Sequence, residues 1–269
     1  MKLSWLTDPH LDFAHKPARK ALAAALRQCR PDGLLITGDV AEATTLAEYL
    51  EWLADAAACP LYFVLGNHDF YQSSITEVRE AVRSLCEADP RLIYLTGAAP
   101  SPLTDEVALV GHDGWGDARV GRPMETPVRL RDFDLIEEIR WLKQEDLVER
   151  LNALGADAAE TLERSLREAL GTHRHVLVAT HVPPTEESAW HEGQGSNADW
   201  SPYFVCGAMG DMLERVAREH PDRRVTVLCG HTHGGGEVWV RPNLQVRTGA
   251  AEYGHPRLQP PLLLLPGAC

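Results

Sequence analysis

The sequence contains no long hydrophobic run. Its longest uninterrupted run of Leu, Ile and Val, Leu262 to Leu265, is far shorter than the roughly 20 apolar residues that a membrane-spanning helix needs. Internal repeats and low-complexity tracts are also absent, and the first residues show no export signal. These absences exclude a membrane-spanning or fibrous protein, and they predict a globular chain in the cytoplasm.

Positive charge is scarce as well. There are 26 Lys and Arg residues against 39 Asp and Glu residues, which gives a net charge of −13. This balance disfavours non-specific binding to nucleic acid or to anionic lipid. The six cysteines include no CxxC pair, which argues against a zinc knuckle or a dithiol redox site and predicts reduced thiols. Any chemistry on phosphate must therefore obtain its positive charge locally.

Short apolar runs and helical patterns alternate along the 269 residues. The runs are short, contain β-branched residues and are bounded by turn residues, which is typical of buried strands. They lie at residues 34–37, 61–65, 92–95, 107–110, 176–179, 225–229 and 244–246. The early alternation predicts βαβ units and a parallel sheet, whereas the close spacing over 225–246 predicts antiparallel hairpins. The fold class is therefore α/β.

Two further segments interrupt this pattern. Residues 134–154 and 157–170 have helical spacing and are separated at Gly155, with no Pro/Gly-rich linker on either side. We expect a helical insertion at about 132–171 within a single domain that covers 1–269. Residues 182–207 are rich in Pro and Gly and show no period, which predicts a long active-site loop.

Polar side chains follow the predicted strands at the point where each strand ends. These residues are Asp8, His10, Asp39, Asn67, His181, His231 and His233. Because ligands of α/β sheets bind at the carboxyl edge of the strands, we expect five separate segments to meet at one cleft. Imidazole nitrogens and carboxylate or amide oxygens suit Mn, Fe or Zn. Seven such groups are too many for one ion and fit two.

In order along the chain, these segments spell D-x-H, GD, GNHD, H and GH-x-H, and this pattern resembles the calcineurin-like metallophosphoesterase superfamily. The resemblance implies a two-sheet β-sandwich flanked by helices in four α/β/β/α layers. It also implies a ligand set with two metal ions. Asp8, His10 and His233 would bind the first ion, Asn67, His181 and His231 the second, and Asp39 would bridge them.

The same resemblance implies a hydrolase of phosphate esters. Two ions lower the pKa of a bridging water and make the site net positive, so that a hydroxide can attack phosphorus. His68 resembles the residue that protonates the leaving oxygen or stabilises the phosphoryl charge, and the neighbouring Asp69 would orient it. We expect a small phosphodiester or nucleotide-like substrate. The alternatives are a phosphomonoesterase or protein phosphatase, then a nuclease; a non-catalytic scaffold is disfavoured by the complete ligand set.

Two other residues are candidates for substrate contact. His112 follows the strand at 107–110 in the same layout as the ligands, although a glycine turn or a supporting role explains it equally well. Trp200 lies in the long loop and would either stack on a planar group of the substrate or anchor the loop.

Overall fold

Two β-sheets form the centre of the molecule. The computed structural model describes residues 1–191 and 193–263. The first sheet has the order β13-β1-β2-β3-β4. Its strands are β1 (Lys2–Leu6), β2 (Gly33–Thr37), β3 (Leu61–Val64), β4 (Leu92–Tyr94) and β13 (Leu262–Leu263). β1 to β4 are parallel and β13 pairs antiparallel with β1, so the predicted βαβ units are confirmed.

The second sheet has the order β11-β12-β10-β7-β6-β5. Its strands are β5 (Ser101–Pro102), β6 (Val107–Gly111), β7 (His175–Ala179), β10 (Arg224–Cys229), β11 (Gly236–Arg241) and β12 (Leu244–Thr248). The prediction of antiparallel hairpins over 225–246 is wrong for β10 and β12, which are parallel. β11 lies between them in sequence and pairs antiparallel with β12 at the sheet edge.

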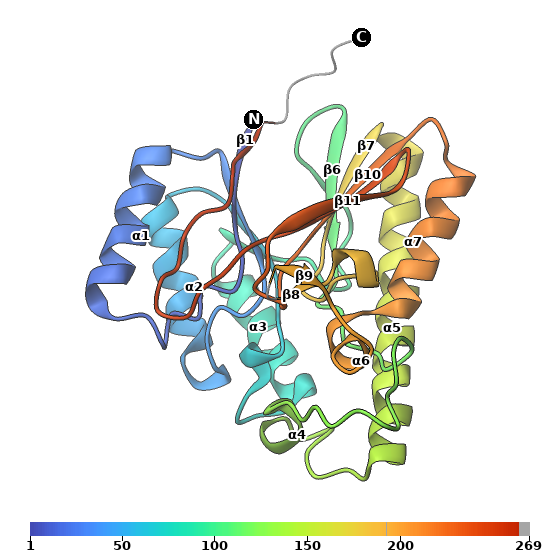
Figure 1. Ribbon diagram of the computed structural model, residues 1–269. Helices are drawn as coiled ribbons and strands as arrows, with labels where there is room; N and C mark the ends of the chain where they lie inside the picture. Colours follow the sequence, from blue (N-terminus) through green and yellow to red (C-terminus); the bar gives the residue numbers. More distant parts are fainter. Residues whose placement is uncertain (192, 264–269) are drawn as a thin grey trace.

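Helices cover the outer face of each sheet (Figure 1). On the first sheet lie α1 (Lys16–Cys29), α2 (Ala43–Ala57) and α3 (Ile75–Ala88), and on the second α5 (Gln144–Thr172) and α7 (Gly207–Glu219). Shorter elements are η1 (His68–Phe70), α4 (Asp132–Leu135), η2 (Glu186–Ser188), β8 (Trp190–His191), β9 (Gln194–Gly195) and α6 (Ser201–Phe204). The predicted sandwich with outer helices is confirmed.

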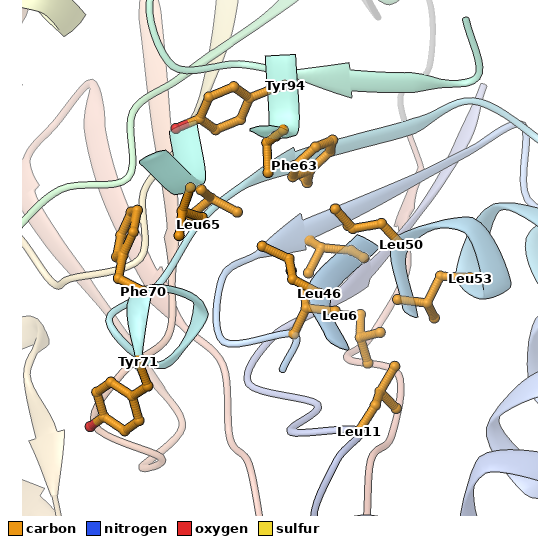
Figure 2. Packing of buried hydrophobic residues seen from close by; sticks show 14 of the residues in the cluster. Leu6, Leu11, Leu46, Leu50, Leu53, Phe63, Leu65, Phe70, Tyr71 and Tyr94 are labelled. Carbon is orange, nitrogen blue, oxygen red and sulfur yellow. The ribbon is translucent and has the colours of Figure 1, made fainter. Parts of the chain in front are cut away.

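Alternation along the strands produces these layers. In β2, Leu35 belongs to the apolar cluster between the sheets, whereas Leu34 and Ile36 belong to the cluster under the helices, as the two-residue period of a strand requires. Figure 2 shows Leu46 and Leu50 of α2 in that outer cluster. Leu50 is fully buried, so its replacement by alanine is expected to lower the free energy of unfolding by about 2–5 kcal/mol.

The helical segment is divided at a different place from the one that the sequence predicts. The predicted helix over 134–154 is wrong at its start, because α4 ends at Leu135 and α5 begins only at Gln144. Gly155 lies inside α5 instead of separating two helices. A glycine fits this position because a side chain there would collide with Asp117 from the loop after β6. α5 packs along α7 in the apolar cluster on the second sheet. The single domain with a helical insertion stays a prediction. No helix in the described ranges has the length and apolar character needed to cross a membrane.

Candidate metal centre

The seven predicted ligands lie together beyond the carboxyl ends of the strands. Asp8 and His10 follow β1, Asp39 follows β2, Asn67 follows β3, His181 follows β7, and His231 and His233 follow β10. Their contacts divide them into two sets that meet at Asp39. We call Asp8, His10 and His233 the first ligand group, and Asn67, His181 and His231 the second ligand group.

In the first ligand group, nitrogen and oxygen atoms face one another closely. Ligand atoms of Asp8, His10, Asp39 and His233 all lie within 4.8 Å of one another. His10 Nε2 is 3.1 Å from His233 Nε2, which is 3.5 Å from Asp8 Oδ1. Nδ1 of His10 is buried and has no hydrogen-bond partner among the described residues. Such a convergence of donor atoms fits a cation at this place.

In the second ligand group, backbone carbonyls fix the histidine tautomers. His181 Nδ1 donates to the carbonyl of Thr37 at 2.8 Å, and His231 Nε2 donates to the carbonyl of Tyr203 at 3.0 Å. The remaining nitrogen of each ring therefore carries a lone pair. These nitrogens are 3.2 Å apart and lie 3.1 Å and 2.9 Å from Oδ1 of Asn67. Three lone-pair atoms thus surround one point.

Asp39 lies between the two groups. Its Oδ1 is 3.4 Å from Nε2 of His181, and its Oδ2 is 3.7 Å from Nε2 of His10. Burial raises the pKa of Asp39, and the carboxylates of Asp8 and Asp69 raise it further. A buried group of carboxylates of this kind calls for positive charge, and cations between the two groups would supply it.

Three of the histidine ligands, His10, His181 and His231, are in the state that metal ligation requires. Burial lowers the pKa of His10 to about 3 and that of His231 to about 3, and it also lowers the pKa of His181. These imidazoles are therefore neutral at pH 7 and keep a free lone pair. Nitrogen donors combined with carboxylate oxygens suit Mn, Fe or Zn.

Backbone strain is concentrated at the ligands. Ten non-glycine residues in the described part of the chain have positive φ, and half of them are predicted ligands. The five are Asp8 (φ 46°), His10 (39°), Asp39 (55°), His231 (70°) and His233 (59°). Left-handed backbone is costly for residues with a Cβ and is retained mainly at functional sites. Gly38 (φ 88°) packs so close to the ring of His181 that a Cβ would collide with it.

His68 and Asp69 have different surroundings. His68 lines the cavity described below, stacks on Tyr71 with ring centroids 4.3 Å apart, and has its Nε2 3.4 Å from the hydroxyl of Tyr253. Asp69 is fully buried, and in the described ranges no hydrogen bond or ion pair joins its carboxylate to the His68 ring. Its carboxylate accepts instead from four backbone N–H groups at 2.7–3.0 Å, those of Asp39, Val40, Ala41 and Gly66. Asp69 thus ties together the two loops that carry Asp39 and Asn67.

A cavity of about 720 Å³ opens over the ligands. Residues that sequence reasoning missed line its walls: Phe13, Arg129, Arg131, Asp132 and Tyr253. Phe13 and Tyr253 are about half exposed, and their rings lie 5.4 Å apart. None of them lies in a ligand motif or shows a period, so the sequence carried no sign of their position.

The two candidate substrate contacts lie outside this lining. His112 is 2% exposed, and its Nδ1 accepts from the backbone N–H of Gly114 at 3.0 Å. Burial lowers the pKa of His112 to about 4. Trp200 packs behind the cavity wall, with its ring 5.1 Å from His191 and 4.9 Å from Phe204. This geometry favours a structural role for His112 in the turn and for Trp200 as an anchor of the loop, instead of contacts with a substrate.

Comparison with known proteins gives one family and several similar folds. The sequence model of the family "Calcineurin-like phosphoesterase" matches residues 1–235. No curated protein matches the chain in sequence. A crystal structure of phosphopantetheinyl hydrolase from Mycobacterium tuberculosis is similar over 94% of this chain and 90% of that chain, with a TM-score of 0.66 and 16% identity.

Two further structures are similar at comparable coverage. A dimetal phosphatase from Danio rerio covers 93% of this chain and 87% of its own, with a TM-score of 0.57 and 16% identity. A protein of Thermus thermophilus covers 93% and 89%, with a TM-score of 0.55 and 15% identity. At these identities the structures establish a shared fold.

Proposed function

The chain belongs to the calcineurin-like phosphoesterase family, and from that premise we propose that it hydrolyses a small phosphodiester or nucleotide-like ester. Members of this family are metal-dependent phosphoric ester hydrolases. The observation that carries the proposal is the meeting of two ligand groups at Asp39 on the floor of one cavity. A site with these donors accommodates two cations and one small anion.

The first ligand group would hold one ion, the second ligand group the other, and Asp39 would bridge them. When bound, two such ions supply Lewis acidity and a nucleophile at neutral pH. We expect both ions to be Mn, Fe or Zn, since the second group offers two imidazoles and an amide. The rest of the reaction falls to side chains of the cavity wall.

His68 is the proposed proton or hydrogen-bond donor to the leaving oxygen. It lines the cavity beside His10, with ring centroids 4.5 Å apart, and its Nε2 lies 3.4 Å from the hydroxyl of Tyr253, which lines the same cavity. The backbone N–H of His68 donates to Asp39 Oδ1 at 2.9 Å, which fixes the residue relative to both ligand groups. Asp69 contributes by holding the loops together, not by orienting His68.

The outer part of the cavity supports a small anionic substrate with a planar group. Arg129 and Arg131 line it and add positive charge to a chain of net charge −13. Arg129 pairs with Asp134 at 2.6 Å, whereas no described residue forms an ion pair with Arg131. Phe13 and Tyr253 present aromatic faces at the opening. A volume of about 720 Å³ is in the range of small-molecule sites.

The test is a substrate panel on the full chain loaded with Mn²⁺ or Zn²⁺. It contains an activated diester, the matching monoester, nucleotides, a phosphopantetheinyl ester, a phosphopeptide and single-stranded nucleic acid. We expect kcat/KM for the diester to exceed that for the monoester at least about tenfold, a difference of about 1.4 kcal/mol in the barrier. Preference for the monoester or phosphopeptide would support the phosphatase alternative, and preference for the polymer the nuclease. Two bound ions without hydrolysis would indicate a scaffold.

We also propose a cytoplasmic location. Five cysteines in the described ranges are free: Cys29, Cys59, Cys86, Cys206 and Cys229. Free thiols are typical of reducing compartments. The sixth, Cys269, lies outside the described residues.

A further inference from the structure

Asp132, the first residue of α4, contacts the second ligand group through the amide of Asn67. It is 5% exposed, and its Oδ1 accepts from Nδ2 of Asn67 at 2.9 Å. The same oxygen accepts from the hydroxyl of Tyr71 at 2.6 Å. None of the ligand motifs contains Asp132, which lies 65 residues after Asn67 in the sequence.

This contact determines which way the Asn67 amide points. An amide has an NH₂ end and an oxygen end of nearly the same shape, and only the oxygen can bind a cation. A carboxylate accepts hydrogen bonds and repels an oxygen, so it selects the NH₂ end. With Nδ2 on Asp132, Oδ1 of Asn67 faces the lone pairs of His181 and His231. Without that contact the amide can rotate and present N–H groups to the cation.

Backbone hydrogen bonds hold α4 against the segment that follows Asn67. The N–H of Gln72 donates to the carbonyl of Leu135 at 3.0 Å, and the N–H of Glu137 donates to that of Ser73 at 3.1 Å. The carboxylate of Glu138 accepts from the N–H groups of Ile75 and Thr76 at the start of α3. These hydrogen bonds therefore hold α4, and with it Asp132, in a fixed position relative to the segment that follows Asn67.

We infer that Asp132 is a positioning residue that sets the orientation of Asn67 for the second cation. This inference rests on the proposed function, because it requires a cation at the second ligand group. It assigns to α4, which lies between β6 and β7 in the sequence, a part in completing the metal centre, in addition to lining the cavity.

The test measures Mn²⁺ binding by equilibrium dialysis, with circular dichroism as the check on folding. The wild-type chain should bind two ions. In Asp132→Ala the affinity of one ion should fall about 10–100-fold, the usual cost of removing a partner of a metal ligand, while the other ion binds as before. Asp134→Ala is the matched control, since Asp134 is an exposed acid of the same short helix that pairs with Arg129. It should bind both ions like wild type.

Asp132→Asn separates orientation from charge. Both donors use the same oxygen of Asp132, so the one carbonyl oxygen of asparagine can replace it. We expect Asp132→Asn to bind both ions within about threefold of wild type, far above the alanine variant.

Equal loss in the asparagine and alanine variants would overturn the inference in favour of a charge effect. Unchanged affinity for both ions in Asp132→Ala would overturn it as well, because Asp132 would then have no part in metal binding. If Asp132→Ala does not fold, Asp132→Ser, whose side chain is too short to reach the amide, takes its place. A wild-type chain that binds fewer than two ions would contradict the proposed function itself, and this inference with it.

Discussion

The two ligand groups differ in what holds their side chains in place. All three residues of the first group have positive φ, and His10 Nδ1 has no hydrogen-bond partner among the described residues. In the second group every ligand has an outside partner: the carbonyl of Thr37, the carbonyl of Tyr203 or the carboxylate of Asp132. Positive φ marks the whole first group but only His231 of the second, and in the first group Asp8 also accepts from the backbone N–H of His231 at 2.9 Å. Contacts with remote residues hold every side chain of the second group.

This difference shows which parts of the chain can change the metal centre. Tyr203 lies in α6, within the predicted active-site loop, and Asp132 lies in α4 at the start of the predicted insertion. Both segments also border the cavity, through Phe204 and Arg131. Changes there are expected to alter the substrate space and the second ligand group together, and to leave the first group as it is.

Replacing Asp39 should have the largest effect, because this residue serves both groups. An amide at this position cannot bridge two cations as strongly as a carboxylate. We expect Asp39→Asn to lose several kcal/mol of transition-state stabilisation, or about 10³-fold in kcat/KM for about 4 kcal/mol, in a folded protein. Steady-state kinetics and metal analysis provide the check. Full activity with two bound ions would remove Asp39 from the site, and Asp55→Asn, an exposed acid on α2, is the control.

Replacing His68 should reduce the rate without removing either ion, since His68 belongs to neither group. We expect His68→Ala to lose about 10²-fold in kcat on a diester with an alcohol leaving group. An activated phenol needs no proton when it leaves, so its ester should suffer much less. Similar losses for both esters would assign His68 to the phosphoryl oxygens instead. An unchanged rate on the alcohol ester would exclude it as the donor to the leaving group.

Metal titration should separate the two groups by affinity. With Asp39 shared, the first group contributes a further carboxylate, Asp8, whereas the second contributes only neutral ligands. We expect the ion at the second group to bind at least about tenfold more weakly than the ion at the first. One more negative charge in contact with a cation contributes more than about 1.4 kcal/mol to its binding free energy.

A chelator titration followed by metal analysis measures this difference in affinity. Activity should return with Mn²⁺ or Zn²⁺ and far less with Ca²⁺, which prefers six to eight oxygen ligands. Equal affinities would contradict the expectation. Undiminished turnover in fully metal-free protein would contradict the metal centre as a whole.

Asp113 should have the smallest effect on activity, since this buried carboxylate belongs to neither group. It accepts from Leu65 N–H, the hydroxyls of Tyr94 and Thr96, and Arg79, at 2.7–2.9 Å. We expect Asp113→Asn to keep both ions and most of the activity. The free energy of unfolding should fall by about 2 kcal/mol, the scale of hydrogen bonds to a charged group.

The pH dependence of unfolding tests this role of Asp113. Burial works to raise the pKa of Asp113, but the charge of Arg79 and the hydrogen bonds lower it below its ordinary value. The stabilisation should therefore be present above about pH 4 and be lost as the pH falls through the folded-state pKa. Denaturant unfolding at several pH values checks both expectations. A difference between wild type and Asp113→Asn that grows below about pH 4 would contradict them.

Much of the first ligand group could be predicted from the sequence. Asp8, His10 and His233 follow short apolar runs, and strands that run in parallel bring their carboxyl ends to one edge. Predictions failed where a local pattern competed with packing. Gly155 suggests a helix end, but Asp117 needs the space that its missing side chain leaves. Asp69 adjoins His68 in sequence, but the backbone N–H groups around it offer better partners.

By itself, the sequence determined the fold class, the order of the ligands and their chemistry, because residue type and position after a strand are local properties. Only the tertiary structure decided which nitrogen of His181 and His231 faces the site, that Asp132 meets Asn67, and that Phe13 and Tyr253 border the same cavity. These contacts join residues far apart in the chain. Their geometry depends on how the sheets and loops pack, and no local pattern encodes that.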